Sequence, residues 1–519
     1  MTVYAALSGP MPKLGVIALA LLVGAALLHP AARPRAIAML AAFALAPVLL
    51  IIDIWHSPQL SVVHRHPALA AAGAVIAGLV VIGLAVAFVR RRSLLALLVT
   101  AALPFRIPIQ AGGVTSNLLV PLYVVVAGGV LAAAFMAWRR PTVPTVEEDR
   151  GDPVAKGPRA GLEALSTVWV ARLLAVYVLL YAVQATYSSD FEKALQQMVF
   201  FYVPFALMFT LLRELRWSAR LLRRCLELVA ALAVLFALVG FVEYATKTII
   251  LNPKLVVQND LHTYFTVNSV FFDPDIFGRF LALVMVALVA ALLYVGRRRE
   301  QLILTAVLAI LWAGLVLTLS RSSLGALLLG MGVLGALRWR PSRTLWVGAA
   351  VIAVGAVAVL ARPTTFGLNQ GLNGASSGRA GLIGGGVHMF GERPLWGYGS
   401  GSFVTEYQRE HRGTATTLAA SHTIAVTIAA EQGVIGELAY LALVLATVFV
   451  LLRGARGDPA RAAVGAAFVA LMLHTNLYAD FLEDPLTWAL LGLGVALATS
   501  TAGAGAPTGR ARRPSFAPG

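Results

Sequence analysis

The stretch that decides the fold class is residues 277–323, FGRFLALVMVALVAALLYVGRRREQLILTAVLAILWAGLVLTLSRSS. It holds two apolar runs, near 277–295 and 301–319, and each is long enough to cross the ~30 Å hydrocarbon core of a bilayer as one helix. Three arginines separate the runs, and one more arginine follows the second run. Apolar runs of this kind recur from Leu14 to Thr499, so the sequence predicts a polytopic membrane protein.

The composition supports this class and excludes others. Hydrophobic residues make up 59% of the 519 residues and charged residues only 13%, whereas about 25% of a soluble domain is charged. The single cysteine, Cys225, excludes an intramolecular disulfide and a cysteine-based metal cluster. Nucleic-acid-binding and collagen-like classes are excluded as well. The first apolar run is followed by no convincing cleavage site, so we expect it to be a retained helix.

The expected fold is an all-α polytopic membrane protein, a bundle of about 12–15 transmembrane helices with one large external loop. The run 94–110 contains Pro104 and Pro108 and is either a span or a re-entrant segment. The run 421–452 is long for one span, so it is either tilted or extends out of the membrane. The expected helices lie near 14–29, 36–53, 68–89, 94–110, 117–138, 168–185, 196–213, 224–245, 277–295, 301–319, 323–338, 344–361, 421–452, 462–480 and 485–502.

Basic clusters predict which loops face the cytoplasm, because loops rich in Lys and Arg stay on that side. Two predicted spans separate each consecutive pair of clusters, so all clusters fall on one side and the C-terminal tail is cytoplasmic. The side of the N-terminus depends on whether the number of spans is odd or even, and the sequence leaves it open. The clusters are Arg90–Arg92, Arg139–Arg140, Arg213 to Arg224, Arg297–Arg299, Arg338 to Arg343, Arg453 to Arg461 and Arg510 to Arg513.

These boundaries divide the chain into six segments. The Gly-rich segment 362–420 is too long for a passive connector, and it is predicted to lie outside. The segments are N-terminal transmembrane helices (1–140), a cytoplasmic loop (141–167), central transmembrane helices (168–361), the large external loop (362–420), C-terminal transmembrane helices (421–502) and a disordered cytoplasmic tail (503–519).

Two arginines stand where charge is costly, at the predicted external ends of spans. Arg321 lies between Ser320 and Ser322, whose hydroxyls add hydrogen-bond donors; it either serves function or reaches to the lipid headgroups. Arg279 follows Asp273 and Asp275, either of which can cap the helix that begins there. An arginine in a first turn is unfavourable, so an anionic ligand or a neighbouring aspartate is expected to offset it.

The large loop and the span after it contribute further candidates. Arg379 is a third external cation, and Trp396 and Tyr398 either stack on a sugar ring or pack within the loop. His422 opens the next span and can act as a base near neutral pH. On a regular helix Glu431 would face away from His422, so we interpret it as a polar anchor between helices.

Acidic and basic groups also crowd the external end of the following span. Asp480 and Asp484 can pair with the external arginines, and His474 is most simply a satisfied buried histidine.

Arginines and a histidine at a membrane face suit a polyanion, since guanidinium binds phosphate with two parallel hydrogen bonds. A polyprenyl-linked glycan donor presents a pyrophosphate at such a surface. Arginines would stabilise the charge that develops on that leaving group, and a neutral histidine would take the acceptor's proton. The large loop has no D-x-D motif, so we expect no metal site, no cofactor and a metal-independent reaction.

Four motifs, in order and on one predicted side, resemble the O-antigen ligase/polymerase family over roughly residues 225–500. They are VNSVFFDPDIFGRF (267–280), LSRS (319–322), GR (378–379) with FGERPLWGYG (390–399), and SH (421–422) with EQG (431–433). The resemblance implies an inverting membrane glycosyltransferase with a large periplasmic loop, a catalytic histidine at His422 and donor binding by Arg321, Arg279 and Arg379. The chain departs from the family in Asp275 and Thr423, where the family usually or often has Asn.

The leading hypothesis is an integral membrane glycosyltransferase that moves a glycan from a polyprenyl-pyrophosphate donor, such as one built on undecaprenyl pyrophosphate, to a hydroxyl acceptor. It would act on the external face of the bacterial inner membrane in cell-envelope biogenesis, as a polymerase of surface polysaccharide or exopolysaccharide or as a ligase. The acceptor is a glycan, a lipid or a protein; the bilayer is a partner and nucleic acid is not. The alternative is a transporter or flippase of a lipid-linked or anionic solute, which predicts charges near the bilayer midplane and two related halves.

Overall fold

The computed structural model describes residues 9–54, 64–111, 114–139, 158–250, 265–339, 379–411, 421–478 and 480–504, together with Asn259 and a few residues between 342 and 353. The predicted helix 344–361 lies almost wholly outside these residues, and the predicted tail 503–519 lies outside them from residue 505 on.

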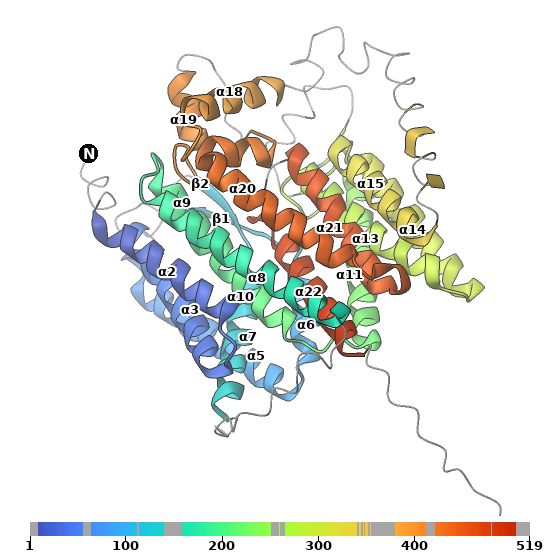
Figure 1. The fold of residues 1–519 in the computed structure, drawn as a ribbon, viewed down its shortest axis with the longest axis horizontal. Helices are drawn as coiled ribbons and strands as arrows, with labels where there is room; N and C mark the ends of the chain where they lie inside the picture. Colours follow the sequence, from blue (N-terminus) through green and yellow to red (C-terminus); the bar gives the residue numbers. More distant parts are fainter. Residues whose placement is uncertain are drawn as a thin grey trace, which may run out of the picture.

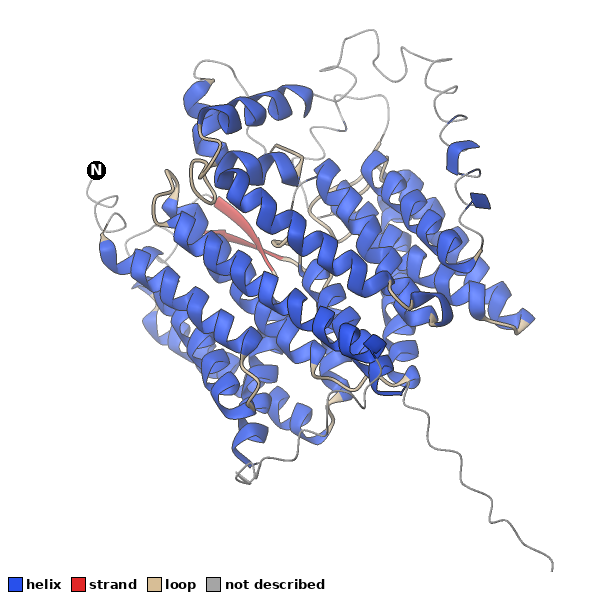
Figure 2. Ribbon diagram, viewed as in Figure 1, coloured by secondary structure: helices blue, strands red, loops and turns tan. Residues whose placement is uncertain are grey.

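Long apolar helices make up most of the described chain, as Figures 1 and 2 show. Eleven are long and apolar enough to cross a membrane, so the all-α polytopic class is confirmed. These spans lie in α2 (Pro10–Leu28), α3 (Ala32–Ile54), α5 (Pro67–Arg90), α7 (Val120–Arg139), α8 (Pro158–Ala185), the continuous run of α9 (Phe191–Gln197), the π-helical η3 (Met198–Tyr202) and α10 (Val203–Arg213), then α11 (Ala219–Thr246), α13 (Pro274–Tyr294), α14 (Arg298–Leu317), α20 (Ile424–Leu452) and α21 (Pro459–Tyr478).

The other helices of the described fold lie outside this set of eleven spans. They are α6 (Ser93–Ala102), α15 (Arg321–Arg338), α18 (Arg379–Glu392), α19 (Phe403–Glu410), the 3-10 turn η5 (Ala455–Gly457) and α22 (Pro485–Ala504). Helix α8 begins at Pro158, inside the segment predicted as a cytoplasmic loop over 141–167.

The run predicted over 94–110 is not one helix. Helix α6 ends at Ala102, and an antiparallel hairpin follows, formed by β1 (Ile107–Ala111) and β2 (Val114–Leu118) with Ile107 opposite Leu118. Figure 2 shows the two strands among the helices. Pro104 and Pro108 lack a backbone N–H and disfavour helix in the residue before them, which explains why the helix does not continue.

Helices α13, α15 and α21 pack together and hold the buried half of the site described below. Helices α18 and α19 lie within the predicted large loop, and α18 packs on α20 at the top of Figure 1. The described part of that loop is therefore structured, and it covers one end of the bundle.

The long predicted span 421–452 is a broken helix. Within α20, Gly433 has φ 65° and ψ −165°, which interrupts the helical backbone. The loop segment before α19 binds at the break: Val434 N donates to Pro394 O at 2.7 Å, and Gly399 N donates to Glu431 O at 2.8 Å. The backbones meet so closely that a Cβ on Gly433 would lie 2.4 Å from the carbonyl carbon of Leu395. The loop thus supplies hydrogen bonds that the broken helix cannot form internally.

We predict that Gly433→Ala destabilises the protein, because alanine would need a left-handed backbone and its Cβ would meet the Leu395 main chain. Such strain costs of order 1–3 kcal/mol before the steric overlap is added. Thermal unfolding of the detergent-solubilised protein, followed by its monodisperse peak in size-exclusion chromatography, measures the effect. Gly391→Ala on α18 is the matched control, since a Cβ there has nothing within 4 Å. Equal unfolding temperatures for the two variants would contradict this account of the break.

Candidate functional site

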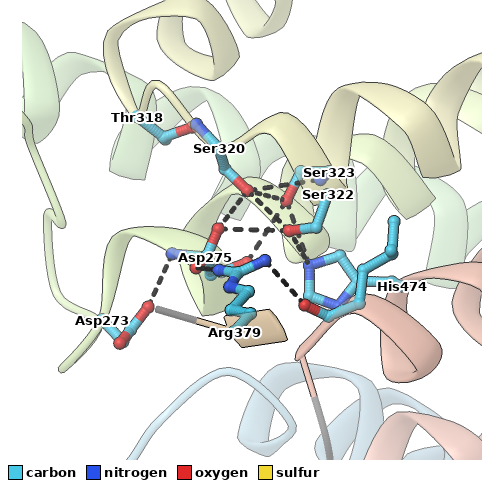
Figure 3. A network of polar contacts seen from close by, with 9 residues as sticks. Asp273, Asp275, Thr318, Ser320, Ser322, Ser323, Arg379 and His474 are labelled. Atoms are coloured by element: carbon cyan, nitrogen blue, oxygen red, sulfur yellow. Dashed lines mark hydrogen bonds and ion pairs between the residues drawn. The ribbon is translucent and has the colours of Figure 1, made fainter. Parts of the chain in front are cut away.

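The Asp275 carboxylate lies at the centre of a polar network at one end of the bundle, shown in Figure 3. One of its oxygens accepts hydrogen bonds from Ser320 Oγ and, at 3.2 Å, from Ser322 Oγ. The other forms an ion pair with Arg379 at 3.6 Å. The Asp275 main-chain oxygen accepts from Ser323 Oγ at 3.3 Å. The network therefore joins the starts of α13, α15 and α18.

Helix caps explain why these residues meet. The Asp273 carboxylate accepts from Asp275 N at 2.7 Å and begins α13, so the predicted cap is confirmed for Asp273. Ser320 caps α15 by accepting from Ser323 N at 3.2 Å. Burial, and then the charge of Asp275, raise the pKa of Asp273. Both caps fix the first turns whose side chains build the network.

Arg321 is the first residue of α15, which therefore begins two residues before the predicted helix near 323–338. Its side chain is exposed, whereas Ser320 and Ser322 on either side are buried. Within the part of the chain that the structure describes, no group forms an ion pair or hydrogen bond with its guanidinium. A cation at a helix N-terminus opposes the helix dipole, and a bound anion would offset this cost.

Two groups of α21 complete the network on its buried side. His474 is fully buried, and its Nε2 lies 3.3 Å from Ser322 Oγ and 3.2 Å from Ser323 Oγ. The Tyr478 ring, one turn further on, lies 5.7 Å from the His474 ring and 5.9 Å from the His422 ring. The sequence placed Tyr478 at the external end of this span but assigned it no role. Its spacing of four residues from His474, which places both on one helix face, is the signal that could have linked them.

His422 lies just before α20 and is half-buried, with a left-handed backbone at φ 57°. Burial and then the charge of Arg379 lower the pKa of His422, while Asp275 and Asp480 act in the opposite direction. The lowered pKa keeps the imidazole neutral at pH 7, the form that can accept a proton.

Backbone strain gathers near the same helix ends. Among the described residues, five other than glycine have positive φ, and Leu319, His422 and Asp480 all adjoin the network or the rings beside it. Such conformations cost of order 1–3 kcal/mol each and cluster at functional sites. The strain is thus a second, independent reason to place a site here.

Arg279 lies beneath this surface and not on it. Its side chain is 1% exposed, and its NH1 forms an ion pair at 3.1 Å with Asp484, which is 2% exposed. The pairing of Asp484 with one of the arginines was predicted and is confirmed, and the alternative pairing with a local aspartate is wrong. Arg279 therefore ties α13 to the segment that precedes α22.

The predicted loop residues have different surroundings. Tyr398 is buried, its hydroxyl hydrogen-bonds Glu392, and the Arg393 guanidinium lies 4.4 Å from its ring centre. Tyr398 thus packs within the loop. Trp396 is 54% exposed, and its main-chain oxygen accepts from Tyr187 Oη at 2.7 Å.

Glu431 is buried, and its carboxylate accepts from Gly401 N at 2.8 Å and from Phe403 N at 3.0 Å. The sequence predicts an anchor between helices, but Glu431 anchors the large loop to α20. His422 lies before α20, which begins at Ile424, and has a left-handed backbone, so the argument from a regular helix joining His422 to Glu431 does not hold.

Fold and site together define a polytopic membrane protein with an Arg, Asp, Ser and His network at one end of its helical bundle. Residues 306–441 match the family model described as O-antigen ligase. This match supports the predicted resemblance to that family. A comparison with curated proteins found no match. The family match supports a membrane enzyme of surface polysaccharide assembly.

The matched segment contains Arg321, Arg379, His422 and Glu431. Asp275, Arg279 and His474 lie outside it and reach the site through the fold. In the described part of the chain, no group of three or more His, Cys, Asp or Glu is arranged to hold a metal ion. Metal independence stays a prediction.

We predict that Arg279→Met destabilises the protein by about 3–5 kcal/mol, because it leaves the Asp484 carboxylate buried without its partner. The double variant Arg279→Met with Asp484→Leu is expected to recover most of that loss, since neither charge then remains buried. A double-mutant cycle of unfolding free energies, with Asp484→Leu as the fourth corner, measures the coupling. Additive effects of the two substitutions would show that the pair does not act as a unit.

Proposed function

We propose that the chain is an integral membrane glycosyltransferase that moves a glycan from a polyprenyl-pyrophosphate donor to a hydroxyl acceptor at the predicted external face. The observation that carries this proposal is the Asp275-centred network, which brings Arg379 and the start of α15 together beside a half-buried His422. The match to O-antigen ligase over residues 306–441 supports the reaction class.

Arg321 and Arg379 are the proposed ligands of the pyrophosphate. The Arg321 guanidinium is exposed and without a partner among the described residues, so binding an anion costs it no existing ion pair. Arg379 is one-third exposed; besides its ion pair with Asp275, its NH1 donates to Leu477 O at 2.9 Å, which fixes its side chain. Planar guanidinium groups suit the oxygens of a pyrophosphate and stabilise the negative charge that it gains as it leaves.

In the proposed reaction, His422 takes the proton of the acceptor hydroxyl. The acceptor oxygen forms a bond to the anomeric carbon of the donor sugar while the bond from that carbon to the pyrophosphate oxygen breaks. The electron pair of the broken bond leaves with the lipid pyrophosphate, and the proton stays on His422 until solvent removes it. A single displacement of this kind inverts the anomeric configuration, and it uses no metal.

Other residues would support these three. Ser320, Ser322, Asp273 and Asp275 hold the first turns of α13 and α15, and Arg279 with Asp484 fixes α13 from beneath. We assign Arg279 a positioning role, since its buried guanidinium is already paired. Exposed Trp396 is the proposed sugar-stacking group, and Tyr398 and Glu431 hold the loop that carries it.

We predict that Arg321→Ala and His422→Ala each lower release of polyprenyl pyrophosphate from a labelled lipid-linked glycan by about 100-fold or more. The assay uses membranes with matched amounts of each variant, with and without EDTA, and wild-type release is expected to be indifferent to EDTA. His388→Ala, which removes an exposed histidine on α18, is the control and should leave release unchanged.

The same assay separates the competing hypotheses. Unchanged release in both variants would overturn the site. Loss of wild-type release in EDTA would overturn the metal-free mechanism. No release from the wild type, over several donors and acceptors, would favour the alternative of a transporter or flippase. Supplying glycan, lipid and protein acceptors in turn distinguishes a polymerase from a ligase.

The pH dependence of kcat/KM tests the role of His422. Its pKa is lowered below the ordinary 6.5, so the basic form is fully present at pH 7 and activity is lost as the pH falls through that lowered pKa. Arg379→Gln removes a positive neighbour, so the acid limb of residual activity should move to higher pH. Asp480→Asn removes a negative neighbour and should move the limb to lower pH. Limbs that coincide in all three proteins would show that His422 is not the titrating base.

A further inference from the structure

A cavity with basic and apolar residues in its lining lies away from the Asp275 network, among the ends of α10 and α22 and the start of α11. Its volume is about 400 Å³, and it is lined by Arg213, Leu215, Arg216, Trp217, Ser218, Ala496, Thr499 and Ser500. Arg213 to Arg224 form one of the basic clusters that predict the cytoplasmic side. The proposed glycosyl transfer uses none of these residues.

The cavity has a positive charge that nearby acids do not cancel. Among the described residues, neither Arg213 nor Arg216 forms an ion pair. The adjacent acid, Glu214, is bound to Arg35 at 2.6 Å. The hydroxyls of Thr499 and Ser500 donate to the main chain of their own helix, at 3.1 Å to Val495 O and 2.9 Å to Leu497 O. Any anion that enters would therefore be bound chiefly by the two guanidinium groups.

The position of the cavity indicates where the anion comes from. Arg213 is the last residue of the span Phe191–Arg213, so the cavity opens at the level where that span ends. Leu215 and Ala496 give it an apolar side. Trp217 lines it and donates from its indole Nε1 to Leu212 O at 3.0 Å, which holds the ring there. Tryptophan is enriched at the membrane–water interface, and basic pockets between helices on this side suit lipid phosphates.

We propose that this cavity binds the phosphate of an anionic phospholipid, with Arg213 and Arg216 as its ligands and Trp217 beside the glycerol backbone. The acyl chains would follow the apolar surface of α10 and α22 into the bilayer. The Arg213 guanidinium lies over the Phe209 ring, 5.5 Å from its centre, and Arg216 is exposed in the loop that follows α10.

Native mass spectrometry of the purified full-length protein, given phosphatidylglycerol or phosphatidylcholine at equal concentration, tests the proposal. Wild type should retain phosphatidylglycerol preferentially. Arg213→Gln with Arg216→Gln should weaken its retention about tenfold or more. Arg216→Gln alone, at an exposed position, should weaken it in part and guards against a folding defect in the double variant.

Arg220→Gln with Arg224→Gln is the matched control, because it removes two exposed charges from the same basic cluster outside the cavity. It should leave lipid retention unchanged. Equal retention of the two lipids, equal losses in the control and cavity variants, or displacement of the lipid by millimolar inorganic phosphate would each overturn the proposal. The last outcome would identify a site for a soluble anion. None of these readouts depends on glycosyl transfer.

Discussion

The carboxylate of Asp275 is the interaction on which the arrangement of the site depends. It accepts from two serines of α15 and pairs with Arg379 at the start of α18. Without a hydrogen-bonding acceptor at this place, the first turns of three helices would have no common partner. The main-chain N–H of Asp275 donates to the capping Asp273 carboxylate, so the position of the network is set by the start of α13. Helix α13 is held from below by the buried pair of Arg279 with Asp484.

A second constraint holds the large loop in place. The Glu431 carboxylate accepts from two main-chain N–H groups of the loop. At the break, Val434 N donates to Pro394 O and Glu431 O accepts from Gly399 N. The loop is thus part of the helical bundle at this end, and it carries exposed Trp396. In the proposed function, this fixed loop would cover a donor whose pyrophosphate is bound by Arg321 and Arg379.

The sequence predicted the features that depend on local pattern. Apolar runs predicted the spans because each helix satisfies its backbone polar groups within itself, and Asp273 marked one helix start. The isolated arginines and His422 were predicted as candidate site residues because a charged group near the membrane needs a partner. Features that join distant segments were out of reach. The location of Arg279 beneath the surface depends on its contact with Asp484. The role of Glu431 depends on loop N–H groups some thirty positions away. The contact of His474 with two serines depends on the packing of α21 against α15.

A cryo-EM structure of the full-length protein with bound polyprenyl pyrophosphate is the measurement that tests the central claim most directly. The account predicts that the phosphate oxygens contact the guanidinium groups of Arg321 and Arg379. It also predicts that the space for the acceptor hydroxyl lies beside His422. A pyrophosphate bound elsewhere, with Arg321 still free of contacts, would contradict it.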